Sequence, residues 1–159
     1  MVILGIDPGT TRIGYGVIEK NNNNFSCLDY GIIENKGKDR ESDFKDTFKN
    51  LSKLISQHSP DISAIEKLFF FKNQRTIISV GEMRGVLRYT LAHHNIPVHE
   101  FTPLQVKQAV SSYGRADKNQ VQKMVRLILG IKTPIKPDDA ADGLAIAICC
   151  ANNIVYSTK

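Results

Sequence analysis

Three short apolar runs open the chain and predict β-strands. They are Val2 to Ile6, Ile13 to Ile18 and Phe25 to Ile33, and only short links separate them. The run of asparagines from 21 to 24 is typical of a hairpin loop. Sequential short strands with tight links pair with their neighbours, so an antiparallel meander of three strands is expected.

From Glu41 onward the apolar period changes from that of a strand to that of a helix. Large apolar residues recur at helical spacing in this segment, which Pro60 closes: Phe44, Phe48, Leu51 and Ile55. A second long helix is predicted from about Arg75 to His94. Its apolar stripe, which is usual for a core-facing helix, consists of Val80, Met83, Leu87 and Leu91.

The remaining runs complete the predicted order β-β-β-α-β-α-β-α-α-α. Two are strands, one from Ile62 to Ile65 that ends at Glu66 and one near Pro97 to Phe101. Three are helices: one from about Pro103 to Val110, one ending at Leu129 with Gly130 as its cap, and a final one with Pro137 as its first residue. This order predicts an α/β fold with a mixed sheet and helices packed on its faces.

Composition and charge narrow the class of protein. The 159 residues are expected to form one domain over residues 1–159, and 42% hydrophobic with 23% charged residues excludes disordered and fibrous chains. The net charge of +5 favours a polyanionic partner, nucleic acid above all. The late apolar run from Leu144 to Ala151 is far shorter than the roughly 20 residues that span a bilayer. Three cysteines and no export signal predict a cytoplasmic protein without membrane contact.

Four acids stand where a structural role is hard to assign. Asp7 ends the first predicted strand and Glu66 the fourth, while Asp139 and Asp142 lie three apart on one face of the final helix. A buried carboxylate without a partner costs several kcal/mol, and like charges on one face repel. A divalent cation resolves both problems. Oxygen ligands without a His/Cys pattern favour Mg²⁺ or Mn²⁺ over Zn²⁺, and two such ions could cleave a phosphodiester.

Each acid also has a structural interpretation. Asp7 could form the turn before Pro8-Gly9, and Glu66 could be a surface acid at a strand end. The acids Asp138, Asp139 and Asp142 could complement the positive end of the helix dipole, which is the favoured interpretation for Asp138. No single acid decides between these interpretations; their joint occurrence favours the metal site.

Five segments in order resemble the motifs of RuvC-type Holliday junction resolvases: "GIDPGTTRIGYGVI", "IEKLFFFKN", "PLQVKQAV", "RADKNQVQKMV" and "DDAADGLAIAI". The resemblance implies an RNase H-like fold with a five-stranded mixed sheet flanked by helices. It also implies that Asp7, Glu66, Asp139 and Asp142 are catalytic, metal-binding acids that hold two Mg²⁺ ions per active site, or Mn²⁺ as a substitute. Asp138, four positions before Asp142, could share that face.

The basic residues bear on the substrate. Lys107, Arg115 and Lys118 lie close to a Ser-Ser-Tyr-Gly break between two predicted helices, where a phosphate could approach, although solvated helix charges would look the same. The resemblance implies that Lys107 and Lys118 contact DNA phosphates and that Phe69 stacks on bases near the crossover. It further implies symmetric nicking of a four-way DNA junction by a homodimer, 5′-phosphate and 3′-hydroxyl ends, and a RuvAB branch-migration complex as partner.

Three other classes share part of the pattern. Sugar kinases, actin and Hsp70-like proteins carry a similar first hairpin, but they need two lobes around a nucleotide, and 159 residues supply about one. A non-catalytic nucleic-acid-binding module would not need four acids. The YqgF-like nuclease family shares the first motif and is expected to lack the "QVKQ" and "DKNQVQ" segments.

Overall fold

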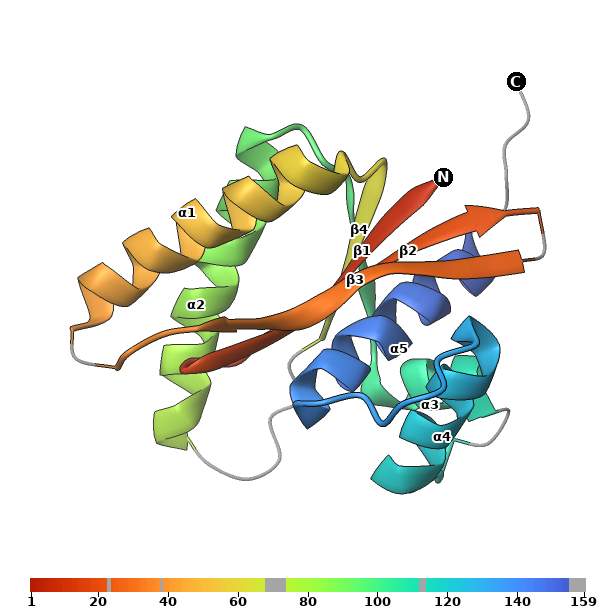
Figure 1. Ribbon diagram of the computed structural model, residues 1–159. Helices are drawn as coiled ribbons and strands as arrows, with labels where there is room; N and C mark the ends of the chain where they lie inside the picture. Colours follow the sequence, from red (N-terminus) through yellow and green to blue (C-terminus); the bar gives the residue numbers. More distant parts are fainter. Residues whose placement is uncertain (23, 38, 68–73, 112–113, 155–159) are drawn as a thin grey trace.

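The computed structural model describes residues 1–22, 24–37, 39–67, 74–111 and 114–154. Its elements follow the predicted order along the chain (Figure 1). They are β1 (Val2–Asp7), β2 (Arg12–Asn21), β3 (Asn24–Glu34), α1 (Arg40–His58), β4 (Ile62–Glu66), α2 (Gln74–His93), β5 (Val98–Phe101), α3 (Pro103–Ser111), α4 (Lys118–Leu129) and α5 (Asp138–Asn153). Within the described residues, no helix has the length and apolar character needed to cross a bilayer.

The strands form one mixed sheet in the order β3-β2-β1-β4-β5. β1 pairs antiparallel with β2, and β2 antiparallel with β3, which confirms the predicted meander. On its other side β1 pairs parallel with β4, and β4 pairs parallel with β5. The two central strands β1 and β4 therefore end at the same edge of the sheet.

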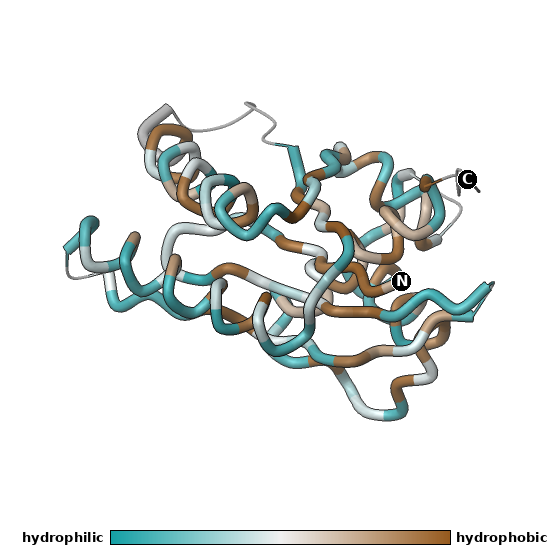
Figure 2. Tube along the Cα trace, turned by 90° about the horizontal axis from the view of Figure 1, so that it is seen from above, coloured by the Kyte–Doolittle hydropathy of each residue, from teal (hydrophilic) through white to brown (hydrophobic). Residues whose placement is uncertain are grey.

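Helices cover both faces of this sheet. α1 and α2 pack on one face, and α3, α4 and α5 on the other (Figure 1). Two hydrophobic cores result, and Figure 2 shows the apolar residues concentrated between the layers. Alternation along β1 divides its residues between them: Leu4 and Ile6 join the core under α1 and α2, and Ile3 joins the core under α5.

The C-terminal helix α5 is the central element of the second core. Its residues from Gly143 to Ala151 are all buried, and Cys149 and Cys150 are fully so. Glycines let α5 approach β2 at backbone distance. A Cβ added at Gly143 would lie 2.5 Å from the carbonyl carbon of Tyr15, and one added at Gly14 would collide with the carbonyl oxygen of Asp139.

Local capping sets where the last two helices begin. Asp117 caps α4 through a reciprocal capping box with Gln120, and Gly130, at a φ of 65°, ends the helix as predicted. Pro137 differs from its prediction by one position. It is the N-cap of α5, because its ψ of 170° is extended rather than helical, and Asp138 is the first helical residue.

Candidate metal centre

Two strand ends bring the first pair of acids together. Ile6 of β1 lies opposite Ile65 of β4 in the parallel register, so Asp7 and Glu66 follow side by side at the carboxyl ends of the strands. Because Ile6 and Ile65 face the core under α1 and α2, the next residue of each strand faces α5. Sheet alternation thus directs both carboxylates to one face.

The start of α5 supplies two further acids. Asp139 and Asp142 lie one helical turn apart, and one carboxylate oxygen from each approaches Asp7. One carboxylate oxygen of Asp7, one of Asp139 and one of Asp142 all lie within 4.8 Å of one another. The close approach of α5 to β2 at Gly14 sets the position of this first turn.

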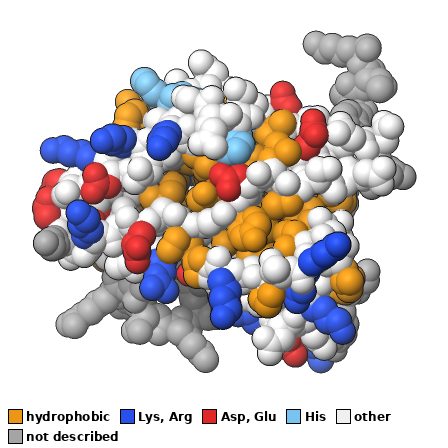
Figure 3. Space-filling model, viewed as in Figure 1, with side chains coloured by type: hydrophobic (Ala, Val, Ile, Leu, Met, Phe, Trp, Pro, Cys, Tyr) orange, Lys and Arg blue, Asp and Glu red, His pale blue; other side chains and the backbone are white. Residues whose placement is uncertain are grey.

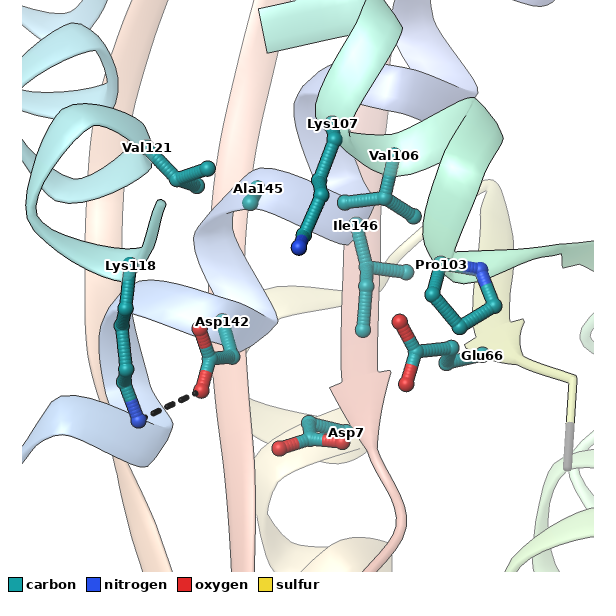
Figure 4. A pocket seen from close by; sticks show the side chains of 10 residues that line it. All are labelled: Asp7, Glu66, Pro103, Val106, Lys107, Lys118, Val121, Asp142, Ala145 and Ile146. Carbon is teal, nitrogen blue, oxygen red and sulfur yellow. Dashed lines mark ion pairs between the residues drawn. The ribbon is translucent and has the colours of Figure 1, made fainter. Parts of the chain in front are cut away.

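A pocket of about 250 Å³ opens above these acids (Figure 4). Asp7, Glu66 and Asp142 line it together with two lysines, Lys107 from α3 and Lys118 from α4. Asp139 is not among the lining residues. The apolar part of the wall consists of Pro103, Val106, Val121, Ala145 and Ile146. In Figure 4 the acids point into the pocket from strand and helix ends, with the lysines beside them.

Burial and mutual repulsion raise the pKa values of these acids, and the neighbouring lysines oppose the rise. Burial, followed by repulsion from Asp142 and Asp139, raises the pKa of Asp7 from 3.8 to about 7, although Lys118 opposes the rise. Burial and then repulsion from Asp7 and Asp142 raise the pKa of Glu66 to about 7, against the effect of Lys107. Burial also raises the pKa of Asp142, despite its ion pair with Lys118. A proton or a cation among these carboxylates would relieve their repulsion.

The donor set fits a hard divalent cation. Among the described residues, the group that could hold an ion consists of carboxylates alone, and the described residues that line the pocket include no His or Cys. Mg²⁺ and Mn²⁺ prefer such ligands, whereas Zn²⁺ sites in proteins are built chiefly from His and Cys, with a carboxylate at most beside them. Burial first, and repulsion between the acids second, raise the pKa values of Asp7 and Glu66, so a cation between the carboxylates would favour their charged forms.

Lys118 forms an ion pair that sequence reasoning missed. Its Nζ lies 3.3 Å from Oδ2 of Asp142 and 3.7 Å from Oδ2 of Asp138. Burial opposes its charge, but attraction to Asp142 and Asp138 outweighs this and raises the pKa of Lys118. The sequence carries no sign of this pair because its members belong to different helices. Asp138, an open alternative as a ligand, is not part of the group of three acids.

Of the two other predicted DNA contacts, the structure describes Arg115. Arg115 is exposed in the connection between α3 and α4 and is not among the lining residues. Phe69 lies outside the described residues. On the face shown in Figure 3, Lys and Arg side chains are spread over both ends of the molecule, over α1 as well as over the end that holds α3 and α4.

Comparison with known proteins gives consistent matches over nearly the whole chain. The family model described as crossover junction endodeoxyribonuclease RuvC matches residues 3–150. The proteins of that name from Petrotoga mobilis and Caldicellulosiruptor saccharolyticus are 51% and 49% identical, covering 96% and 94% of this chain and 94% and 91% of theirs. The structure of Thermus thermophilus RuvC in complex with a Holliday junction substrate superposes with a TM-score of 0.89 at 31% identity, covering 95% of this chain and 93% of that one.

Proposed function

The chain belongs to the RuvC family of crossover junction endodeoxyribonucleases, and on that premise we propose that it nicks the two opposing strands of a four-way DNA junction at the acidic pocket, as a single nuclease domain over residues 1–159. One observation carries the proposal. Carboxylates from two strand ends and one helix converge on a single open pocket that two lysines border. Clustered, partly buried carboxylates repel one another, and the fold has no structural need for them.

The acids Asp7, Glu66, Asp139 and Asp142 are proposed as the catalytic ligands of Mg²⁺, with Mn²⁺ as a substitute and two ions per site. When bound, the ions would activate the attacking water and neutralise charge on the phosphate. The rigid strand ends hold Asp7 and Glu66 in place, and the first turns of α5 hold the other two. Hydrolysis would leave 5′-phosphate and 3′-hydroxyl ends.

The cations around the pocket are proposed to position the DNA backbone. Lys107 and Lys118 flank the acids from α3 and α4, so a phosphate entering the pocket meets both charges. Arg115, exposed between those helices, would extend the contact, and Phe69 would stack on bases at the crossover. The relative from Thermus thermophilus, solved with a Holliday junction substrate, supports this class of ligand.

We also propose a homodimer formed through α2. An exposed stripe follows this helix, in which Ile78 is 65% and Tyr89 64% exposed. Between them lie Gly81 and Gly85, where an added Cβ would meet nothing within 4 Å, so a second helix could approach closely. A mostly apolar hollow of about 570 Å³ continues the stripe between α1 and α2. A two-fold dimer would present two pockets to a two-fold junction.

Sedimentation of the Gly85→Glu variant tests this interface. The substitution leaves the monomer core untouched and places a charge in the stripe, so the variant is expected to sediment as a monomer at concentrations where the wild type is dimeric. Lys123→Glu, at an exposed position of α4, serves as the control. An unchanged dimer in Gly85→Glu would place the interface elsewhere. A RuvAB partner remains a prediction from the family, and a cytoplasmic location remains a prediction from the sequence.

Comparing a mobile four-way junction with a linear duplex of the same sequence tests the proposed function. In Mg²⁺ the junction is expected to yield paired nicks that DNA ligase can seal, and the duplex is expected to remain intact. Equal cleavage of both substrates would identify a nuclease without junction selectivity. ATP hydrolysis without junction cleavage would favour the kinase-like alternative.

A further inference from the structure

Lys118 stands where its own helix disfavours a positive charge. It is the first residue of α4, directly after the N-cap Asp117. The helix macrodipole places partial positive charge at this end, and beyond the N-cap Asp117, whose carboxylate accepts from the backbone N–H of Gln120, the first turn of α4 contains no acidic residue. A partner outside α4 must therefore explain the position of this lysine.

Two carboxylates of α5 provide that partner. Asp138 and Asp142 are four positions apart, so they lie on one face of the helix, where two like charges repel. The ammonium of Lys118 lies within 4 Å of an oxygen of each, at 3.3 Å from Asp142 and 3.7 Å from Asp138. Figure 4 shows the inner of the two pairs at the edge of the pocket. Lys118 offsets the repulsion and ties α4 to α5.

The two carboxylates differ in what else they face. Asp142 lines the pocket and belongs to the group of three acids that could hold a cation, whereas Asp138 belongs to neither set among the described residues. The side chain of Asp138 is 60% exposed, against 32% for Asp142. Lys118 therefore bridges an inner acid that a bound ion would use and an outer acid that it would not.

Building on the proposed function, we propose that Asp138 is a positioning residue that acts through Lys118 and does not ligate the ion. Together with Asp142 it holds the lysine against the acidic cluster of the metal-free protein. Lys118 and a divalent ion then compete for Asp142. When the ion binds, Asp138 keeps the released ammonium at the rim of the pocket, where the DNA backbone passes.

Calorimetric titration of the DNA-free protein with Mn²⁺ tests the competition. Lys118→Met removes the competing ammonium and is expected to bind Mn²⁺ about three- to tenfold more tightly than the wild type, given the energy of partly exposed ion pairs. Lys123→Met, at an exposed lysine of the same helix, is the matched control and is expected to leave the affinity unchanged. Unchanged or weaker binding by Lys118→Met would overturn the competition.

The same titration distinguishes an anchor from a ligand at Asp138. Asp138→Asn is expected to bind Mn²⁺ within about threefold of the wild type, because only a partly exposed ion pair is lost. A tenfold loss of affinity would make Asp138 a ligand and would overturn the proposal. The side chains of Asp138 and Lys118 are 60% and 52% exposed, so neither substitution empties the core.

Junction cleavage at subsaturating Mg²⁺ tests whether Asp138 acts through Lys118. Asp138→Asn is expected to slow cleavage about two- to fivefold, whereas Asp138→Glu, which keeps the charge, is expected to retain the wild-type rate. When combined with Lys118→Met, Asp138→Asn is expected to have no further effect on the rate. An equal loss with and without Lys118 would overturn the proposal. Failure of the wild type to cut the junction would instead refute the proposed function, and the DNA-free titration would still decide the competition.

Discussion

Replacing Asp7 with Asn is expected to stabilise the metal-free protein while it removes activity. The pKa of Asp7 rises from 3.8 to about 7 in the folded chain, through burial and then repulsion by Asp142 and Asp139. At 1.36 kcal/mol for each tenfold change in proton affinity, ionising Asp7 costs the folded state up to about 4 kcal/mol relative to the unfolded state. Asn has nearly the same shape and never ionises, so the variant avoids this cost.

The sign of the effect gives it a pH dependence. A carboxyl group whose pKa is raised on folding contributes stability that is fully present below pH 3.8, the pKa of the unfolded state, and is lost as the pH rises through about 7. The free energy of unfolding of Asp7→Asn is therefore expected to gain about 2 to 3 kcal/mol on that of the wild type between pH 5 and pH 8.

Urea unfolding in EDTA, followed by circular dichroism from pH 5 to pH 8, measures this difference. Glu34→Gln is the control, because Glu34 is exposed in a 3.9 Å surface pair with Arg12 and its replacement is expected to change stability by less than about 0.5 kcal/mol. Added Mg²⁺ is expected to stabilise the wild type and not Asp7→Asn. Parallel pH profiles for the two proteins, or a destabilised Asp7→Asn at pH 8, would refute the reasoning.

Three further outcomes are expected. Lys107→Ala removes one cation from the pocket rim and should reduce the slope of log junction affinity against log salt by about 0.9, measured by fluorescence anisotropy; an unchanged slope would remove Lys107 from the DNA contact. Gly14→Ala should cost about 1 to 3 kcal/mol in urea unfolding because its Cβ collides with Asp139, whereas Gly81→Ala, which meets no neighbour, should not destabilise the protein. Mn²⁺ affinity should rise with pH up to about 7 and then level off, since ions and protons compete for Asp7 and Glu66; a flat profile from pH 5.5 to 8.5 would contradict the raised pKa values.

Much of the fold and half of the site follow from local patterns in the chain. Alternating apolar runs predict the strands, and the acids that interrupt two of them, Asp7 and Glu66, mark the strand ends that meet in the sheet. The i, i+3 spacing of Asp139 and Asp142 places both on one helical face. These are short-range periodicities, so a single sequence contains them in full.

The remainder depends on contacts between distant elements, which no local period encodes. The ion pair of Lys118 with Asp142 requires α4 and α5 to pack side by side. The glycine at position 14 gives no sign in the sequence that it faces Asp139 on α5. The predicted start of α5 differs from the observed one by one residue because proline suits both the N-cap and the first helical position.

A cleavage assay on a four-way junction with the wild type and Asp7→Asn, with junction binding measured in parallel, tests the central claim most directly. If the acids at the strand ends form the metal site at which the junction is cut, Asp7→Asn binds the junction as well as the wild type does. Its cleavage rate in Mg²⁺ falls about a hundred- to a thousandfold or more. Cleavage by Asp7→Asn at the wild-type rate would contradict the assignment of this pocket as the active site.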